Sequence, residues 1–406
     1  MTDEATPADA APVKSLPRNV KVLGFASLLN DVASEMIFPL LPGFLVTLLG
    51  GNKFLLGVIE GLADSVASLL KLWSGGLSDR AGRRKGFVVF GYSMAALVRP
   101  LIGLIVAPWQ LAAVRVTDRI GKGIRTSPRD ALIADSCDPR QRGRAFGFHR
   151  AMDHLGAAIG PLLATAFLWF WPDQIRTLFL ITLLPGLAVV ALVVFGLKEA
   201  PTTTSPRPQV RLTLAPFDRN FRLFLLALIV FSLGNSSDAF LLYRAGELGV
   251  PTFLLPTLWC AFHVLKSLAN VVFGHAVDRF GPKRFIVLGW FVYAVVYLAF
   301  AVATSAWQAW VIFLSYALFY GLTEPAEKTL VAALVGPDRK GLAFGWFNFS
   351  IGITTLPASL LFGALYQEFG PLAAFGTGAG LALLASLLVS VVRSPSSPAK
   401  PKHGHE

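Results

Sequence analysis

The feature that most constrains the fold is the stretch of residues 111–135, which is as long as a membrane span and lies between apolar segments. It nevertheless carries many ionisable side chains: Arg115, Asp118, Arg119, Lys122, Arg125, Arg129, Asp130 and Asp135. If the stretch is helical, Arg115, Arg119, Lys122 and Arg129 fall within an arc of about 80°. Each charge at the centre of a bilayer costs about 2.5–3.5 kcal/mol even on a lenient scale. This face must therefore turn toward protein or a watery cavity.

The rest of the chain has the composition of a membrane protein. Of its 406 residues, 54% are hydrophobic and only 15% are charged, whereas soluble domains are about 25% charged. Apolar runs long enough to cross a bilayer recur from end to end. We predict an all-α membrane protein with twelve transmembrane helices. The predicted spans cover about residues 22–48, 54–74, 86–107, 109–135, 145–170, 177–197, 221–246, 252–277, 284–304, 307–335, 342–366 and 371–393.

The basic residues predict the orientation in the membrane. Alternate loops differ sharply in charge, and Lys and Arg gather in one set of them. That set carries Arg80, Arg83, Arg84 and Lys85, then Arg140, Arg142 and Arg144, then the central linker, then Arg279, Lys283 and Arg284, then Arg339 and Lys340. Basic loops stay in the cytoplasm, so we expect both termini on the cytoplasmic side. We expect the membrane to be a bacterial plasma (inner) membrane. The net charge of +12 is thereby explained without a nucleic-acid partner.

The two halves of the chain repeat each other. Residues 143–148 (GRAFGF) match 341–346 (GLAFGW) at a spacing of 198, and residues 75–85 match 274–284 at a spacing of 199. Six spans repeated in parallel predict two pseudo-symmetric six-helix bundles that enclose a central site. The predicted parts are a cytoplasmic tail (1–21), an N-terminal half (22–197), a cytoplasmic linker (198–220), a C-terminal half (221–393) and a second tail (394–406).

At these residues the chain resembles the major facilitator superfamily over essentially its whole length. The loop motif of that family has the form Gly-x-x-x-Asp-Arg-x-Gly-Arg-Arg. It is complete here as Gly75, Asp79, Arg80, Gly82, Arg83 and Arg84, and it recurs as Gly274, Asp278, Arg279 and Gly281. The resemblance implies the fold of that family. It also implies that the motif is a gate latch, which holds the outward-open state, with the Asp meeting a helix N-terminus or an Arg across the interface of the halves.

The fifth predicted span resembles the drug/proton antiporters of the family. Their pattern of Gly, eight residues, Gly, three residues and Gly-Pro matches Gly147, Gly156, Gly160 and Pro161. The trailing Gly-Gly of the pattern is Ala-Thr here. The resemblance implies proton-coupled efflux. The other interpretation of these glycines is generic packing of small residues between helices.

Carboxylates near the middle of the membrane are the candidates for proton coupling. Asp31 and Glu35 share one face of the first span, about 14–20 Å from its cytoplasmic start, and Asp153 lies in the fifth span. Burial disfavours a charged carboxylate while a nearby cation favours it, so a carboxylate that alternates between these environments can couple a proton to a conformational change.

Substrate is expected at the cationic face of the fourth span. We predict that Arg115, Arg119 and Lys122 bind it, together with Asn235, Asp238 and Glu324 of the second half. Arg offers a planar fork to a carboxylate or phosphate, and Lys offers a point charge. A second interpretation remains open, in which these charges only neutralise the acids of the first half as a structural network.

The motifs of other function classes are absent from the sequence. There is no HExxH, no G-x-S-x-G and no Walker loop, and two cysteines form no metal spacing. We therefore expect no enzyme, no cofactor and no metal. We expect a monomeric secondary transporter that moves a small anionic or zwitterionic solute by alternating access, with protons as partners and efflux as the direction. The alternative is a proton symporter that imports an anionic metabolite or a siderophore-type ligand.

Overall fold

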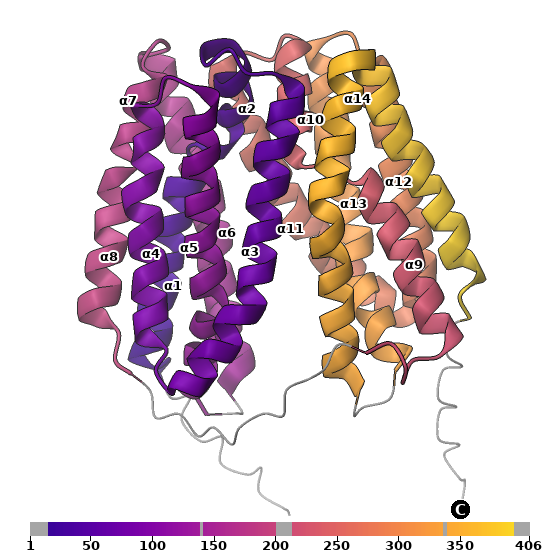
Figure 1. Cartoon of the computed structure of the whole chain (residues 1–406), viewed down its shortest axis with the longest axis horizontal. Helices are drawn as coiled ribbons and strands as arrows, with labels where there is room; N and C mark the ends of the chain where they lie inside the picture. Colours follow the sequence, from indigo (N-terminus) through magenta and orange to yellow (C-terminus); the bar gives the residue numbers. More distant parts are fainter. Residues whose placement is uncertain (1–14, 139–140, 200–212, 336–338, 394–406) are drawn as a thin grey trace, which may run out of the picture.

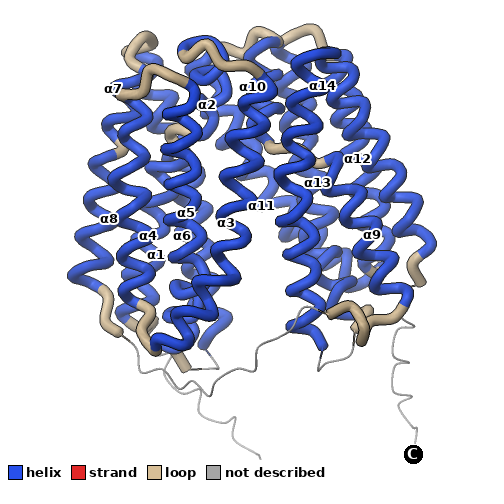
Figure 2. The backbone as a smooth tube through the Cα atoms, in the orientation of Figure 1, coloured by secondary structure: helices blue, strands red, loops and turns tan. Residues whose placement is uncertain are grey.

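The computed structural model describes residues 15–138, 141–199, 213–335 and 339–393, without the side chains of Leu72, Asp278 and Lys340. Every regular element in these ranges is helical (Figures 1 and 2). Eight helices are long and apolar enough to cross a membrane. The charged helices α3 and α5 and the helix α13 have the length but not that composition, and α14 contains two spans. Together they make the twelve spans that the sequence predicts.

The first half contains six spans. In chain order these are α1 (Arg18–Glu35) continued by η1 (Phe38–Leu40), α2 (Leu41–Gly43) and η2 (Phe44–Leu48); α3 (Lys53–Ala81); α4 (Lys85–Val98) with η3 (Arg99–Gly103); α5 (Pro108–Asp135); α6 (Arg142–Phe170); and α7 (Ile175–Ile181) with α8 (Leu183–Gly196).

The second half follows the same plan. Its spans are α9 (Arg219–Gly234) continued by α10 (Asp238–Glu247); η5 (Thr252–Leu254) with α11 (Leu255–Phe280); α12 (Pro282–Val302); α13 (Ala306–Ala333); and the two parts of α14 (Lys340–Val391). The chain reverses within α14 at Gly370, whose φ of 80° is open to glycine but costly for other residues.

The two halves stand side by side as separate bundles (Figure 1). The start of α1, the turn that joins α3 to α4 and the end of α14 lie on one side of the molecule, which we call the basic face (Figure 1). Bonds between the halves lie away from that face. Lys53 of α3 pairs with Glu247 of α10 at 2.9 Å, and the hydroxyls of Thr165 and Thr257 lie 2.8 Å apart. In Figure 1 the ribbons of the halves diverge toward the basic face.

The first and seventh spans are interrupted, although each was predicted as one continuous span. The α-helix of the first span ends at Glu35, and a short 3-10 turn containing Pro39 follows. Proline removes a backbone donor and clashes with the preceding turn. In the seventh span α9 ends at Gly234, and the Ser237 hydroxyl caps α10 by accepting the Ala239 N–H at 3.3 Å. A serine at this position competes with a continuous helix.

Candidate functional site

Both interruptions face a central pocket of about 310 Å³ between the halves. Broken helices at corresponding positions of two repeats are a strong pointer to the binding site of a transporter. The volume lies at the lower end of small-molecule sites, roughly 300–1,000 Å³. The pocket is lined by Glu35, Phe38, Asp64, Arg119, Lys122, Asn235, Ser236, Ser237, Asp238, Trp259, His263, Tyr320 and Thr355.

The first half supplies the cations of this pocket. Arg119 and Lys122 project from α5, and the Arg119 Nε lies 3.4 Å from an Asp64 carboxylate oxygen. The Lys122 side chain is exposed, and no carboxylate among the described residues lies within 4.0 Å of its ammonium. Lys122 is therefore a cation that can accept an anionic partner without first breaking an ion pair.

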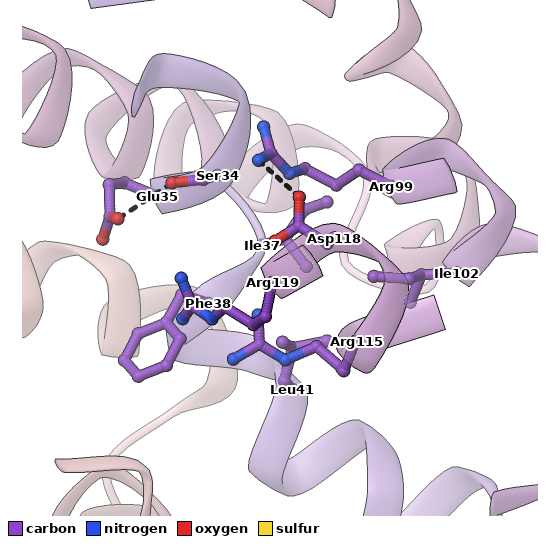
Figure 3. A pocket seen from close by; sticks show the side chains of 10 residues that line it. All are labelled: Ser34, Glu35, Ile37, Phe38, Leu41, Arg99, Ile102, Arg115, Asp118 and Arg119. Atoms are coloured by element: carbon purple, nitrogen blue, oxygen red, sulfur yellow. Dashed lines mark hydrogen bonds and ion pairs between the residues drawn. The ribbon is translucent and has the colours of Figure 1, made fainter. Parts of the chain in front are cut away.

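Other charges of α5 are held in buried ion pairs. Arg115 contacts both oxygens of Glu60, at 3.0 and 2.7 Å, and Arg99 donates to Asp118 at 2.8 Å. All four are at least nine-tenths buried. Arg99, Arg115 and Asp118 line a small cavity of about 20 Å³ (Figure 3), which has room for about one water. Arg115 thus does not line the central pocket, and its guanidinium already has a bidentate partner.

The second half supplies a carboxylate and a polar turn. Asp238, the first residue of α10, accepts hydrogen bonds from the Tyr316 hydroxyl at 3.1 Å and from the Tyr320 hydroxyl at 3.1 Å. Asn235 lies in the turn before it and lines the pocket. Glu324, which was also predicted to bind substrate, lies outside the lining and pairs with Lys266 at 2.9 Å.

The comparison with known proteins decides the family. Residues 23–265 and 223–406 match the family model of the Major Facilitator Superfamily. The chain belongs to this superfamily. It is accordingly a membrane-embedded secondary transporter that moves a small-molecule substrate by alternating access, and it is not an enzyme.

Its relatives include transporters and proteins without an assigned role. An uncharacterised MFS-type transporter of Methanocaldococcus jannaschii is 32% identical over 93% of this chain and 95% of its own length. An uncharacterised protein of Mycobacterium tuberculosis is 28% identical over 95% of both chains. The multidrug resistance protein MdtH of Salmonella arizonae is 22% identical over 78% of both.

Solved structures share the fold at low identity. A bacterial homologue of the human lysosomal transporter Spinster, in an inward-facing and unoccupied conformation, has a TM-score of 0.71 at 15% identity and covers 93% of this chain and 96% of its own. A mutant of the peptide transporter POT in complex with sulfate has a TM-score of 0.77 at 13% identity, with 93% and 94% covered. The human organic anion transporter MFSD10 has a TM-score of 0.62 at 18% identity, with 92% and 99% covered.

The three proton-coupling candidates of this superfamily member lie in different surroundings. Glu35 lines the central pocket and accepts the Trp259 indole N–H at 2.7 Å, across the interface between the halves. Asp31 accepts from the Asn30 amide at 2.9 Å. Asp153 accepts from the Ser27 hydroxyl and lies 3.5 Å from the His149 ring. Only Glu35 contacts both the pocket and the second half.

The superfamily loop motif closes on itself within the first half. Gly75 and Asp79 lie near the end of α3, Arg80 is in its last turn, and the left-handed Gly82 (φ 60°) ends it. The chain then turns through exposed Arg83.

Arg84, at the end of the motif, is buried and pairs with Asp79 at 3.1 Å and with Asp135 at the end of α5. A helix N-terminus or an Arg of the other half was the predicted partner of Asp79, but its partner here is Arg84. The turn at Gly82 brings Arg84 back against Asp79. In the second copy Arg279 is exposed and lies 5.2 Å from the Phe280 ring, whereas the Asp278 side chain is outside the described residues.

Three aromatic residues of the pocket, Phe38, Trp259 and Tyr320, were missed by sequence reasoning. The Trp259 ring lies 5.1 Å from Phe38 and 4.5 Å from His263, centroid to centroid. His263 lines the pocket as well. The available signal was the spacing of Trp259 and His263, four residues apart on one helix face of the eighth span. Within the described residues no group of three His, Cys, Asp or Glu side chains could hold a metal ion.

Proposed function

We propose that this transporter exports a small solute with a carboxylate or phosphate group, anionic or zwitterionic overall, in exchange for protons. The observation that carries the proposal is the Lys122 ammonium, which faces the central pocket without a carboxylate partner among the described residues. Arg119 beside it adds a planar fork that suits the same groups. A cation in a partly desolvated site attracts an anionic group more strongly than it would in water.

Several similarities support the choice of an anionic solute and of efflux. Human MFSD10, which shares the fold, is an organic anion transporter, and the POT structure contains sulfate. The MdtH relatives are multidrug resistance proteins. The fifth-span pattern Gly147, Gly156, Gly160 and Pro161 points to the antiporter branch as well.

Removal of the Lys122 charge tests the substrate site. We expect Lys122→Ala to weaken binding of the transported anion about tenfold or more without unfolding the protein. Arg119→Lys should also weaken transport, because the fork is lost although the charge remains. The matched control is Lys328→Ala, which removes an exposed lysine of α13 outside the pocket. Unchanged affinity in Lys122→Ala would refute the proposal.

The alternative role of Arg119 is to neutralise an acid. The sequence predicted only that this partner would be an acid of the first half, and the carboxylate that pairs with Arg119 is Asp64. The paired variant Arg119→Gln with Asp64→Asn therefore separates the roles. Recovery of transport in the pair, measured in proteoliposomes, would leave Arg119 with a structural role only.

Proton coupling is assigned to Glu35, with Asp31 and Asp153 as the other candidates. A carboxylate that contacts both halves can link its protonation to their relative position. We expect Glu35→Gln to abolish transport driven by a pH gradient while substrate still exchanges across proteoliposomes without a gradient. If Glu35→Gln and Asp31→Asn both keep gradient-driven transport, the coupling site lies elsewhere. The direction of the gradient that drives uptake distinguishes an antiporter from the alternative importer.

We further assign the basic face to the cytoplasm of a bacterial inner membrane, with residues 22–197 and 221–393 as the two halves of a monomer. Positive loops support this orientation. Impermeant labelling from outside should reach Asn52→Cys and should not reach Ser205→Cys.

A further inference from the structure

Lys122 and Asp238 are opposite charges without an ion-pair partner, and they face the central pocket from opposite halves. Of the charges that the structure describes in the lining, the remaining unpaired one, Glu35, is the proposed proton site. Lys122 projects from α5 and Asp238 from the start of α10. Among the described residues no carboxylate lies within 4.0 Å of the Lys122 ammonium, and no basic nitrogen lies within 4.0 Å of the Asp238 carboxylate. Their separation therefore exceeds a direct contact. The pocket presents a positive pole on one wall and a negative pole on the other.

The negative pole is held in a fixed position. The Tyr316 and Tyr320 hydroxyls both donate to Asp238, and the Tyr316 side chain is fully buried. Ser237 caps the helix that begins at Asp238, where the backbone N–H groups favour a negative charge. Asp238 is thus oriented by neutral donors, which leaves its charge available to a cation.

Apolar surface adjoins the two poles. Phe38 and Trp259 pack against each other at 5.1 Å in the pocket wall, and the Tyr320 ring lies beside Asp238. A ligand whose charges reach both Lys122 and Asp238 would therefore place its uncharged part against these aromatic rings.

We propose that the substrate is a zwitterionic amino carboxylate, with its carboxylate at Lys122, its ammonium at Asp238 and an apolar body against Phe38 and Trp259. This inference narrows the proposed function and rests on it. An anion alone leaves Asp238 unpaired in a desolvated site and a cation alone leaves Lys122 unpaired, and an uncompensated charge is costly. Because the two poles belong to different halves, the ligand binds most tightly to a state in which the halves approach each other around it.

Matched sets of ligands that differ only in charge pattern test the inference on the purified full-length transporter. One set is phenylalanine, 3-phenylpropanoate and 2-phenylethylamine, and the other is leucine, 4-methylpentanoate and 3-methylbutylamine. Binding is measured by calorimetry and by the shift in melting temperature. In at least one set the zwitterion should bind about tenfold or more tightly than both of its partners, which corresponds to about 1.4 kcal/mol.

Variants then assign the two poles. Asp238→Asn should bring the affinity for the zwitterion down to about that for the anion without weakening binding of the anion, whereas Lys122→Ala should weaken both. Tyr320→Phe keeps the ring and removes one hydrogen-bond donor to Asp238, so it should lower the affinity for the zwitterion only, and by less. It tests the same pole if Asp238→Asn does not fold. The control Asp173→Asn removes an exposed carboxylate outside the central pocket and should change no affinity.

The outcomes separate this inference from the proposed function. If anions bind as tightly as zwitterions and Asp238→Asn changes neither, the zwitterion assignment is wrong while an anion transporter remains. If no zwitterion of either set binds at millimolar concentration, the assignment is also wrong. If Lys122→Ala changes no affinity at all, the assignment and the proposed function fall together.

Discussion

The interiors of the two halves solve the same packing problem with different chemistry. In the first half Arg99 pairs with Asp118. At a spacing of 198 residues these positions become Tyr297 and Tyr316, whose ring centroids lie 6.3 Å apart. Lys122 likewise corresponds to Tyr320. Charges hold the fourth span in the first half, and rings hold the tenth span in the second.

The difference shows how one backbone plan can carry two functions. The charged half gives the pocket its cations, while the aromatic half gives it rings and the hydroxyls that orient Asp238. Buried ion pairs stabilise little in net terms, because desolvation offsets their attraction. In the charged half the ion pairs therefore fix the positions of charged side chains but add little net stability. Removing one partner of a pair should nevertheless lower the free energy of unfolding strongly, because the other charge stays buried without compensation.

The largest expected effect comes from breaking one buried pair. Glu60→Ala leaves Arg115, which is 6% exposed, without its carboxylate partner, and should lower the free energy of unfolding by about 3–5 kcal/mol. Phe313→Leu, at the position of the second half that corresponds to Arg115, should lower it by less than about 1.5 kcal/mol. Both are measured by unfolding in detergent. Equal losses would contradict the comparison, whereas Glu60→Leu with Arg115→Met should recover most of the stability.

A close approach of helices in each half gives the next largest effect. A Cβ at Gly91 would lie 2.5 Å from the backbone oxygen of Gly121, and one at Gly289 would lie 2.4 Å from a methyl of Thr323. Alanine at either position should cost about 1–3 kcal/mol through overpacking. Gly91→Ala should cost more, since a backbone oxygen yields less readily than a side chain. A larger loss in Gly289→Ala would mean that the ring-packed half is the more rigid one.

Removal of one ring from the second half should have a smaller effect. Phe231 stacks on Trp290 with centroids 4.7 Å apart and planes at 5°. Phe231→Leu should cost about 0.5–1.5 kcal/mol beyond the loss of buried area, as read from the melting temperature. The loss should be insensitive to salt, because no charge takes part. A loss that varied with salt would show that the ring cluster depends on charged neighbours.

The smallest stability effect is expected between the halves. Lys53 and Glu247 are 23% and 26% exposed in their pair, and partly solvated pairs contribute only about 0–1 kcal/mol. Glu247→Gln should barely change the melting temperature, and it keeps an acceptor for the Tyr366 hydroxyl at 2.5 Å. It should nevertheless increase cysteine labelling from the outer side at Val250, a buried residue of the adjoining cavity. Unchanged labelling would show that packing between the halves, without this ion pair, keeps the side opposite the basic face closed.

Much of the fold could be predicted from the sequence, because its signals are local or repeated. Apolar length gives the spans, and the spacing of 198 gives the two bundles. The interruptions at Glu35 and at Asn235 escaped prediction although Pro39 and Ser237 mark them. A single proline or serine can be accommodated in a membrane helix as well as break it, so the outcome depends on what the neighbouring helices leave open.

The sequence by itself determined that α5 must hide its cationic face, since lipid cannot solvate charge. It could not determine which cation stays available. Helical periodicity predicts the direction of a side chain but not the residue that it contacts. The partners Glu60 and Asp64 belong to another helix and lie more than fifty residues away in the sequence. Only the tertiary packing of α3 on α5 gave Arg115 a bidentate carboxylate and left Lys122 facing the pocket. The choice of partner depends on distances of a few ångströms, which are fixed when the helices pack together.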